Sequence, residues 1–238
     1  MTVRVLLADD HRILREGLIA LLAREGDIEL VGQAEDGLAA VRLARELQPD
    51  VAVIDVAMPG LNGLEAMRRI RDEAPAVRTL CLSVHDDSRM VLAVLDAGAS
   101  GYVLKDCSFD ELALAIRKVM ANQVYLSPDI VGIVVNEVRQ RGAPRAASTT
   151  SALTPREREL VQLLSEGHST AEIAERLHVS AKTVATHREH VLHKLEVRGI
   201  AELTRYALRE GLSSIDAPCG PARARPPRRA VSAKSRAA

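Results

Sequence analysis

Short runs of aliphatic residues alternate with helix-like stretches through the first half of the chain. The apolar runs fall at 3–8, 28–34, 51–55, 77–84 and 101–105, and apolar residues at helical spacing fall at 11–25, 37–47, 62–73, 86–97 and 108–121. Strands that alternate with helices in this way favour a parallel sheet covered on both faces. The pattern predicts an α/β fold over residues 1–125, with a five-stranded, parallel, doubly wound sheet of the flavodoxin-like type.

The hydrophobic pattern changes after this region. Ser127 followed by Pro128 is typical of a helix start and predicts one connecting helix, and the small polar residues at 142–152 predict a flexible segment, so that 126–152 forms a linker. Thr154-Pro155-Arg156-Glu157 has the sequence of a capping box. Three further helices are predicted at 170–177, 181–195 and 200–210. The sequence therefore predicts a small all-α domain over residues 153–215.

Composition narrows the class of protein. The chain has 238 residues, 47% of them hydrophobic, which is enough to bury a core in each domain. No apolar stretch approaches eighteen residues, and charges occur early at the N-terminus, so we expect no membrane span, no secretory signal and a cytoplasmic location. The three cysteines are widely spaced without a CxxC pair, which predicts neither a disulfide framework nor a zinc site.

The charges are unevenly distributed, although the net charge is zero. From Ala217 to the end there are six basic residues and no acidic ones, together with four of the ten prolines. Such a segment cannot bury an apolar face. We therefore expect residues 216–238 to form a disordered basic tail, which either adds affinity for DNA phosphates or only keeps the protein in solution.

Polar side chains stand where four of the predicted strands end. Asp9 and Asp10 follow the first strand, Asp55 ends the third, Ser83 ends the fourth and Lys105 ends the fifth. Each residue alone is explained as a helix cap or a solvated strand end. In a parallel sheet, however, all five converge on one edge, where carboxylates suit Mg²⁺ and a carboxylate such as Asp55 can accept a phosphoryl group. The combination predicts a Mg²⁺-dependent phosphoryl-acceptor site.

Three motifs, together with Ser83, resemble the receiver domain of two-component response regulators over residues 1–122. They are DDH at 9–11, DVAMPGLNG at 55–63 and GYVLK at 101–105. The resemblance implies that Asp55 is the phospho-acceptor and that Lys105 and Ser83 contact the phosphoryl group. It also implies a Mg²⁺ site, whose ligands are Asp9, Asp10, Asp55 and the backbone carbonyl of Ala57. Tyr102 is implied to be a switch residue that turns inward behind Ser83.

A helix-turn-helix is predicted within residues 170–195. The apolar positions expected to face the core are Ile173, Ala174, Leu177, Val184, Val191 and Leu195. Ser180 is expected to cap the second helix, and the polar stripe opposite its core face contains Lys182, Thr186, Glu189 and His193. Such a stripe suits the major groove of DNA, but it is explained equally well as the solvated face of a small bundle. His187 lies near the core face and is expected to be partly buried and hydrogen-bonded.

Two segments of this domain resemble the LuxR-type DNA-binding domain over residues 153–212. They are LTPREREL at 153–160 and STAEIAERLHVSAKTVATHREHVLHKL at 169–195. The resemblance implies that the helix beginning near Ala181 reads DNA. The implied phosphate contacts are Lys182, Thr183, Arg188, His190 and Lys194, and the residues implied to face base edges are Ala185, Thr186 and Glu189.

Together the two resemblances indicate a response regulator of the NarL/FixJ type, which is not an enzyme. We expect it to accept phosphate from a sensor histidine kinase, to bind double-stranded promoter DNA and to form a homodimer when phosphorylated, with no membrane partner. Leu203, Ala207 and Leu208 in the last helix are a candidate dimer surface. Two alternatives stay open: a regulator that binds DNA without phosphorylation, and an aspartyl-phosphate hydrolase. Such hydrolases commonly carry Asp-x-Asp, whereas Ala57 stands two residues after Asp55.

Overall fold

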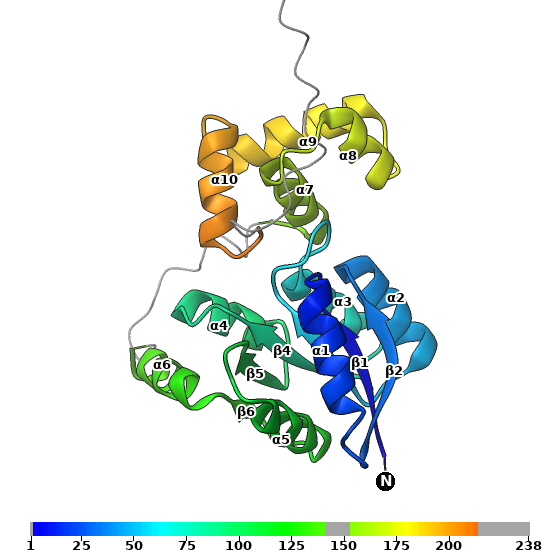
Figure 1. The fold of residues 1–238 in the computed structure, drawn as a ribbon. Coiled ribbons are helices and arrows are strands. Elements are labelled where there is room, and N and C mark those ends of the chain that lie inside the picture. The colour runs from blue at the N-terminus through cyan, green and yellow to red at the C-terminus, as the bar shows by residue number, and fades with distance from the viewer. Residues whose placement is uncertain (1, 141–152, 214–238) are drawn as a thin grey trace, which may run out of the picture.

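The computed structural model describes residues 2–140 and 153–213 and places them in two units (Figure 1). The first unit, here called the sheet domain, contains a parallel sheet with the strand order β2-β1-β3-β4-β5-β6. Its strands are β1 (Val3–Ala8), β2 (Ile28–Ala34), β3 (Val51–Asp55), β4 (Arg78–Ser83), β5 (Gly101–Leu104) and β6 (Tyr125–Leu126). The strand order reverses between β1 and β3, which is where ligand sites of such sheets form.

Helices cover both faces of the sheet, as the strand pattern predicted. They are α1 (Arg12–Leu22), α2 (Gly37–Leu47), α3 (Gly63–Glu73), α4 (Ser88–Asp96) and α5 (Phe109–Met120). Helices α2, α3 and α4 contribute to one apolar core, and α1 and α5 contribute to the core on the opposite face. Residues of β1 alternate between the two cores: Leu6 packs into the first, whereas Val5 and Leu7 pack into the second. The inner strands β1, β3, β4 and β5 are buried on both sides, which explains their nearly continuous aliphatic sequence, whereas the edge strand β2 has exposed positions.

Local side-chain contacts fix where several helices begin. Asp36, Asn62, Asp87 and Ser108 precede α2, α3, α4 and α5, and each accepts a hydrogen bond from a backbone N–H in the first turn. These contacts satisfy backbone donors that the helix itself leaves free. The helices that follow the strands thus start at defined residues, and the loops between strand ends and helix starts stay short.

The predicted number of strands in the sheet was wrong. The sheet has six strands rather than five, because Tyr125 and Leu126 pair with Gly101 and Tyr102. A two-residue strand is too short to show the alternation on which the prediction rested. The connecting helix predicted from Ser127-Pro128 is present as α6 (Pro128–Gln140), which packs against α4.

The second unit, here called the helical domain, contains α7 (Pro155–Ser165), α8 (Thr170–Arg176), α9 (Ala181–Lys194) and α10 (Ile200–Arg209). Thr154 and Glu157 form the predicted capping box, and Ser180 caps α9. The helices share one core, which includes Val184 and Val191 of α9. No helix in the described ranges is both long enough and apolar enough to span a bilayer. The segments predicted to be flexible or disordered, 142–152 and 216–238, lie outside the described residues.

Candidate functional site

The carboxyl ends of β1, β3, β4 and β5 bring the predicted polar residues to one edge of the sheet. The Lys105 ammonium lies 2.7 Å from Asp55 Oδ2 and 2.8 Å from Asp9 Oδ2. Asp9 and Asp55 are buried, with exposed fractions of 0% and 1%, while Asp10 and Lys105 are partly exposed. The strand-end argument thus predicted the positions correctly: a cation and three carboxylates meet at one point of the rim.

The residues after β1 hold this arrangement in place. The backbone N–H of His11 donates to Asp9 Oδ1 at 2.7 Å, and the Arg15 guanidinium donates to the Asp9 carbonyl at 2.5 Å. The His11 imidazole lies 2.9 Å from Asp10 Oδ1 and 4.0 Å from Asp55 Oδ2. Neither His11 nor Arg15 was identified as a site residue from the sequence, although His11 is part of the DDH motif.

The turn after Asp55 explains how a nearly buried carboxylate stays at the end of its strand. The Gly63 N–H donates to the Val56 carbonyl at 2.9 Å, and a Cβ placed on Gly63 would lie 1.9 Å from the Asp55 carbonyl oxygen. Gly60 has φ of +76°, in the left-handed region that glycine adopts without strain. Both glycines belong to the DVAMPGLNG motif, so their physical role is to let α3 start directly against the backbone of Asp55.

Ser83 and Tyr102 lie behind this rim. Ser83 is buried and its hydroxyl accepts a hydrogen bond from the His85 N–H at 3.0 Å. The Tyr102 side chain is fully buried, and its hydroxyl donates to the His85 carbonyl at 2.6 Å. Tyr102 thus occupies the inward position that the sequence predicted, and it is joined to Ser83 through the His85 backbone. Its role as a switch stays a prediction.

The electrostatics of the rim indicate a shortage of positive charge. Burial raises the pKa of the Asp55 carboxyl above its usual value; the Lys105 ammonium opposes this shift without cancelling it, and the Asp9 carboxylate adds to it. Burial lowers the pKa of Lys105, but the carboxylates of Asp55 and Asp9 outweigh burial and raise it above its ordinary value. One ammonium is therefore too little to compensate the carboxylates gathered at this edge.

The same residues can hold a divalent cation. Ligand atoms of Asp9, Asp10, His11 and Asp55 all lie within 4.8 Å of one another. Asp10 Oδ1 is buried and accepts no hydrogen bond from the described residues, although the His11 imidazole lies close to it. A buried carboxylate oxygen that faces an imidazole nitrogen, beside an aspartate with a raised pKa, is a site that a hard cation such as Mg²⁺ fits.

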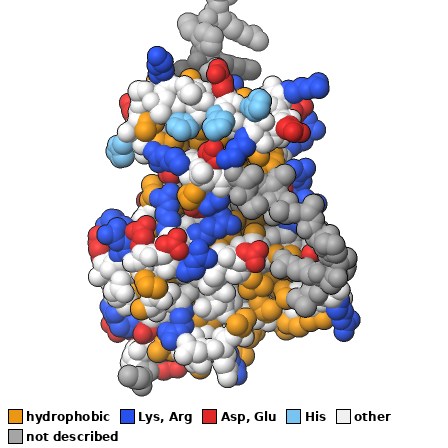
Figure 2. Space-filling model, turned by 180° about the vertical axis from the view of Figure 1, so that it is seen from behind, with side chains coloured by type: hydrophobic (Ala, Val, Ile, Leu, Met, Phe, Trp, Pro, Cys, Tyr) orange, Lys and Arg blue, Asp and Glu red, His pale blue; other side chains and the backbone are white. Residues whose placement is uncertain are grey.

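Helix α9 presents most of the predicted DNA-contacting residues to solvent. Among these residues, Lys182, Ala185, Thr186, Glu189 and His190 are exposed, and Thr183, Arg188 and Lys194 are half-buried. Lys194 Nζ lies 2.8 Å from Glu157 Oε2 and is thereby tied to α7. Figure 1 places α9 on the side of the helical domain away from the sheet domain, and Figure 2 shows histidine and basic side chains on the surface of the helical domain.

Two expectations about the helical domain were wrong. His187 is exposed rather than partly buried, because the packing partners of α9 cover Val184 and Val191 but do not reach the position between them. Of the three residues predicted to form a dimer surface, Leu203 and Ala207 are fully buried in the core of the helical domain and are unavailable to a second copy, whereas Leu208 is half-buried and its role stays a prediction. The sequence shows that these residues lie on an apolar stripe, but not whether the stripe faces its own domain or a second molecule.

Comparison with known families places both domains. Residues 5–117 match the family described as response regulator receiver domain, and residues 151–207 match the family described as bacterial regulatory proteins, luxR family. The oxygen regulatory protein NreC of Staphylococcus aureus is 37% identical over 214 residues, which cover 88% of this chain and 99% of NreC.

Solved structures give the same picture. A two-component response regulator of the LuxR family from Aurantimonas sp. SI85-9A1 is 41% identical, covers 58% of this chain and 98% of its own, and superposes with a TM-score of 0.56. A structure of two RcsB dimers bound to two parallel DNAs is 25% identical, covers 88% of this chain and 99% of its own, and gives a TM-score of 0.55. The similarity to NreC and RcsB extends over both domains.

Proposed function

This chain belongs to the response regulators in which a receiver domain controls a LuxR-type DNA-binding domain, and we propose that Asp55 is its phospho-acceptor. The family consists of phosphorylation-controlled transcription regulators that work with sensor kinases and bind DNA. The observation that carries the proposal is the position of the Lys105 ammonium, 2.7 Å from Asp55 Oδ2 at the end of β3. A cation held against one carboxylate oxygen is well placed to stabilise charge on a phosphoryl group transferred there.

The phosphoryl donor that we propose is a phosphohistidine of a sensor histidine kinase. An Asp55 carboxylate oxygen would attack phosphorus, so that a P–O bond forms, the P–N bond to histidine breaks, and the histidine nitrogen leaves with the electron pair and takes up a proton. Ser83, also at this edge, would donate a hydrogen bond from its hydroxyl to a phosphoryl oxygen; the same hydroxyl oxygen accepts from the His85 N–H.

We propose Mg²⁺ as the cofactor, held by Asp9, Asp10, Asp55 and the backbone carbonyl of Ala57. The raised pKa of Asp55 and the clustering of the Asp9, Asp10 and Asp55 carboxylates support this assignment. When bound, the cation supplies positive charge that offsets the negative charge of the phosphoryl oxygens. The chain's own contribution is to fix the positions of these oxygen ligands, through the His11 N–H that donates to Asp9 and the Ala57 N–H that donates to Asp55 Oδ1.

The output that we propose is regulated binding of double-stranded promoter DNA by α9 in a homodimer. The division of the chain would be a receiver at 1–125, a linker at 126–152, a DNA-binding domain at 153–215 and a basic tail at 216–238. The exposed polar face of α9 supports the DNA contacts predicted from the sequence. Pairing of two copies would add affinity, because one helix reads only a short half-site.

The two alternatives are less well supported. A regulator that ignores phosphorylation has no use for a buried Asp9, Asp55 and Lys105 cluster, which costs desolvation energy. Such hydrolases commonly carry an acid two positions after the nucleophile to assist the leaving group, whereas Ala57 stands there and has no acidic side chain; its backbone N–H donates to Asp55 Oδ1 at 3.1 Å. Both alternatives make distinct predictions in one experiment.

The experiment is phosphorylation of the full-length protein by acetyl phosphate with Mg²⁺, read by intact mass together with DNA retention. We expect a stable adduct of one phosphoryl group on the wild type that is absent from Asp55→Ala, and tighter DNA binding by the phosphorylated wild type. Asp72→Ala, at an exposed acidic residue of α3, is the control and should form the adduct normally. DNA binding without an adduct would favour the constitutive regulator, and continuous turnover of acetyl phosphate without DNA binding would favour the hydrolase.

A further inference from the structure

The backbone turn that follows Asp55 is held by the DNA-binding domain. Gln162 Nε2 of α7 donates to the Met58 carbonyl at 3.2 Å, and Gln162 Oε1 accepts from the Asn62 N–H at 3.0 Å. The Gly60 N–H donates to Glu166 Oε2 at 3.4 Å. Gln162 Nε2 also donates to Glu166 Oε1 at 2.7 Å, which joins the two side chains into one unit. We call this pair, Gln162 and Glu166, the clamp.

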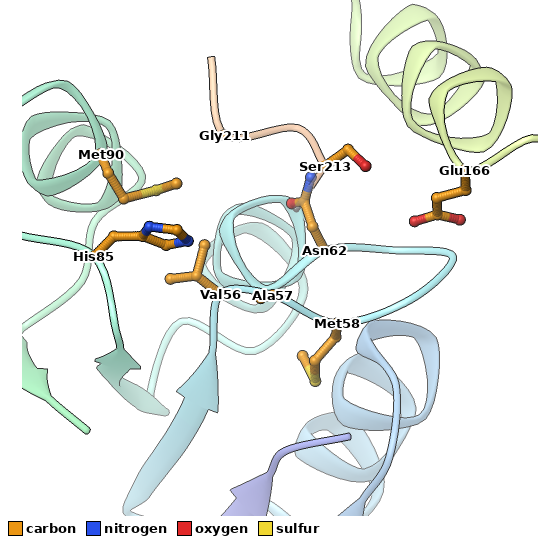
Figure 3. A pocket seen from close by; sticks show the side chains of 9 residues that line it. All are labelled: Val56, Ala57, Met58, Asn62, His85, Met90, Glu166, Gly211 and Ser213. Carbon is orange, nitrogen blue, oxygen red and sulfur yellow. The ribbon is translucent and has the colours of Figure 1, made fainter. Parts of the chain in front are cut away.

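The clamp is sealed from water. Gln162 is 1% exposed, and Met58, Asn62 and Glu166 are also buried. Figure 3 shows the Glu166 side chain at the end of α7 facing the turn that carries Met58 and Asn62. Burial raises the pKa of Glu166, while its hydrogen bond from Gln162 opposes the shift. Because buried backbone groups without partners are costly, these hydrogen bonds specify the conformation of the turn.

Other contacts join the same two domains without touching the turn. Arg158 Nε of α7 lies 2.9 Å from Glu65 Oε2, and Arg69 of α3 lies 3.2 Å from Glu159 Oε2. Both ion pairs attach α7 to the side of α3. Arg158 and Glu159 therefore contribute to docking without holding the turn, whereas Gln162 and Glu166 do both, so that substitutions can separate the two effects.

The position of the turn gives the clamp a chemical consequence. Met58, whose carbonyl accepts from Gln162, directly follows Ala57, the residue proposed to supply a carbonyl ligand to Mg²⁺. Removing a group that holds a metal ligand in its orientation commonly weakens metal binding by about 10- to 100-fold. The exposed face of α9 takes no part in these contacts, so the clamp does not depend on whether the DNA-reading surface is covered.

We propose that Gln162 and Glu166 are positioning residues for the phosphorylation site, so that the DNA-binding domain sets the metal affinity of the receiver domain. This inference rests on the proposed function in one respect, which is the assignment of the residues that bind the metal. Holding the Met58 carbonyl restricts the neighbouring Ala57 peptide and reduces the conformational entropy lost when its carbonyl binds a cation. Loss of the clamp is expected to weaken the cation site while leaving phosphoryl transfer intact once the site is filled.

The test compares the full-length wild type with Gln162→Met and Arg158→Met. Gln162→Met keeps the side-chain volume and removes both hydrogen bonds to the turn; Arg158→Met removes an ion pair between the same domains and spares the turn. Mn²⁺ is the probe, because its binding is measured directly by the loss of the free-ion EPR signal without any phosphorylation. The Mg²⁺ dependence of the rate of phosphorylation by acetyl phosphate is measured on the same proteins.

We expect Gln162→Met to weaken Mn²⁺ binding about tenfold and to raise the Mg²⁺ concentration for half-maximal rate by the same factor, with an unchanged maximal rate. Arg158→Met should match the wild type in both readouts. Equal Mn²⁺ affinities in all three proteins, or equal losses in both variants, would overturn the assignment of the clamp. A wild type that binds Mn²⁺ but forms no adduct would refute the proposed function and leave the clamp to be judged by Mn²⁺ affinity alone.

Discussion

Lys105 and Asp55 form a nearly buried ion pair, with Nζ 2.7 Å from Oδ2, at the carboxyl edge of the sheet. The same ammonium lies 2.8 Å from Asp9, so that one cation holds two carboxylates together. Removing one partner of a buried charge pair is costly because the remaining charge stays buried without compensation. Lys105 is thus required both for the stability of the metal-free receiver domain and for the chemistry proposed at Asp55.

Lys105→Met is expected to lower the free energy of unfolding by about 3–5 kcal/mol in metal-free buffer. Mg²⁺ should restore part of this loss, because a bound cation replaces the missing positive charge. Urea unfolding with and without Mg²⁺ measures both effects. Lys118→Met, at an exposed position on α5, is the control and should change stability by no more than about 0.5 kcal/mol. Equal losses in the two variants would contradict the role assigned to Lys105.

The raised pKa of Asp55 predicts a pH dependence of stability. A carboxyl whose pKa is raised by folding favours the folded state fully below its ordinary pKa, 3.8, and this contribution is lost as the pH rises through the raised value. Asp55→Asn cannot ionise. It is therefore expected to be more stable than the wild type at pH 7 without metal, with a difference that shrinks as the pH falls toward 3.8.

Urea midpoints over this pH range, in buffer containing a chelator, test the dependence on Asp55. Asp72→Asn is the matched control, because its carboxyl is exposed. The control should show a difference from the wild type that changes little with pH. A pH-independent gain in Asp55→Asn would mean that the carboxyl is not destabilised by burial.

Gly63→Ala is expected to be strongly destabilising. The added Cβ would lie 1.9 Å from the Asp55 carbonyl oxygen, which is backbone and cannot move aside without displacing β3. We expect a loss of about 3 kcal/mol or more, at the upper end of the range for overpacking. Gly17→Ala in α1 is the control: no atom lies within 4 Å of its Cβ, and alanine should stabilise the helix by about 0.5–1 kcal/mol. Thermal unfolding of both variants should shift in opposite directions.

The proposed DNA face predicts two different kinds of effect. Lys182→Ala should weaken binding to all duplexes and reduce the slope of log affinity against log salt concentration by about 1, because one phosphate contact is lost. Glu189→Ala should leave the slope unchanged and instead alter the preference among bases by about 1–3 kcal/mol. Anisotropy titrations at several salt concentrations distinguish the two, with Lys118→Ala as a basic control outside α9. An unchanged slope in Lys182→Ala would exclude the proposed phosphate contact.

The cluster of residues around Asp55 could be predicted from the sequence because these residues end strands. Parallel strands bring their carboxyl ends to one edge whatever the details of packing, so that Asp9, Asp55 and Lys105 had to meet once the α/β pattern was recognised. The capping box at Thr154 and the core positions of α9 were predicted for a similar reason, since they depend on residues within a few positions of one another. Gly63 belongs to the DVAMPGLNG motif, but the reason for a glycine there, the close approach to the Asp55 carbonyl, is visible only in the structure.

The residues that were missed depend on contacts distant in the sequence. His187 lies between two core positions of α9, and only the arrangement of the neighbouring helices decides that it is exposed. Leu203 lies on an apolar stripe that could cover either its own domain or a second copy, and the fold directs it inward.

The sequence by itself determined the two domains, the strand-end constellation around Asp55 and the helix-turn-helix, because these follow from local periodicity and capping. Only the tertiary structure decided that Gln162 and Glu166 contact the turn after Asp55. Residues 104 positions apart, such as Met58 and Gln162, are joined by hydrogen bonds that no local pattern encodes. A polar residue on α7 has the same sequence signal whether it faces water or another domain; packing removes it from water and gives it a partner.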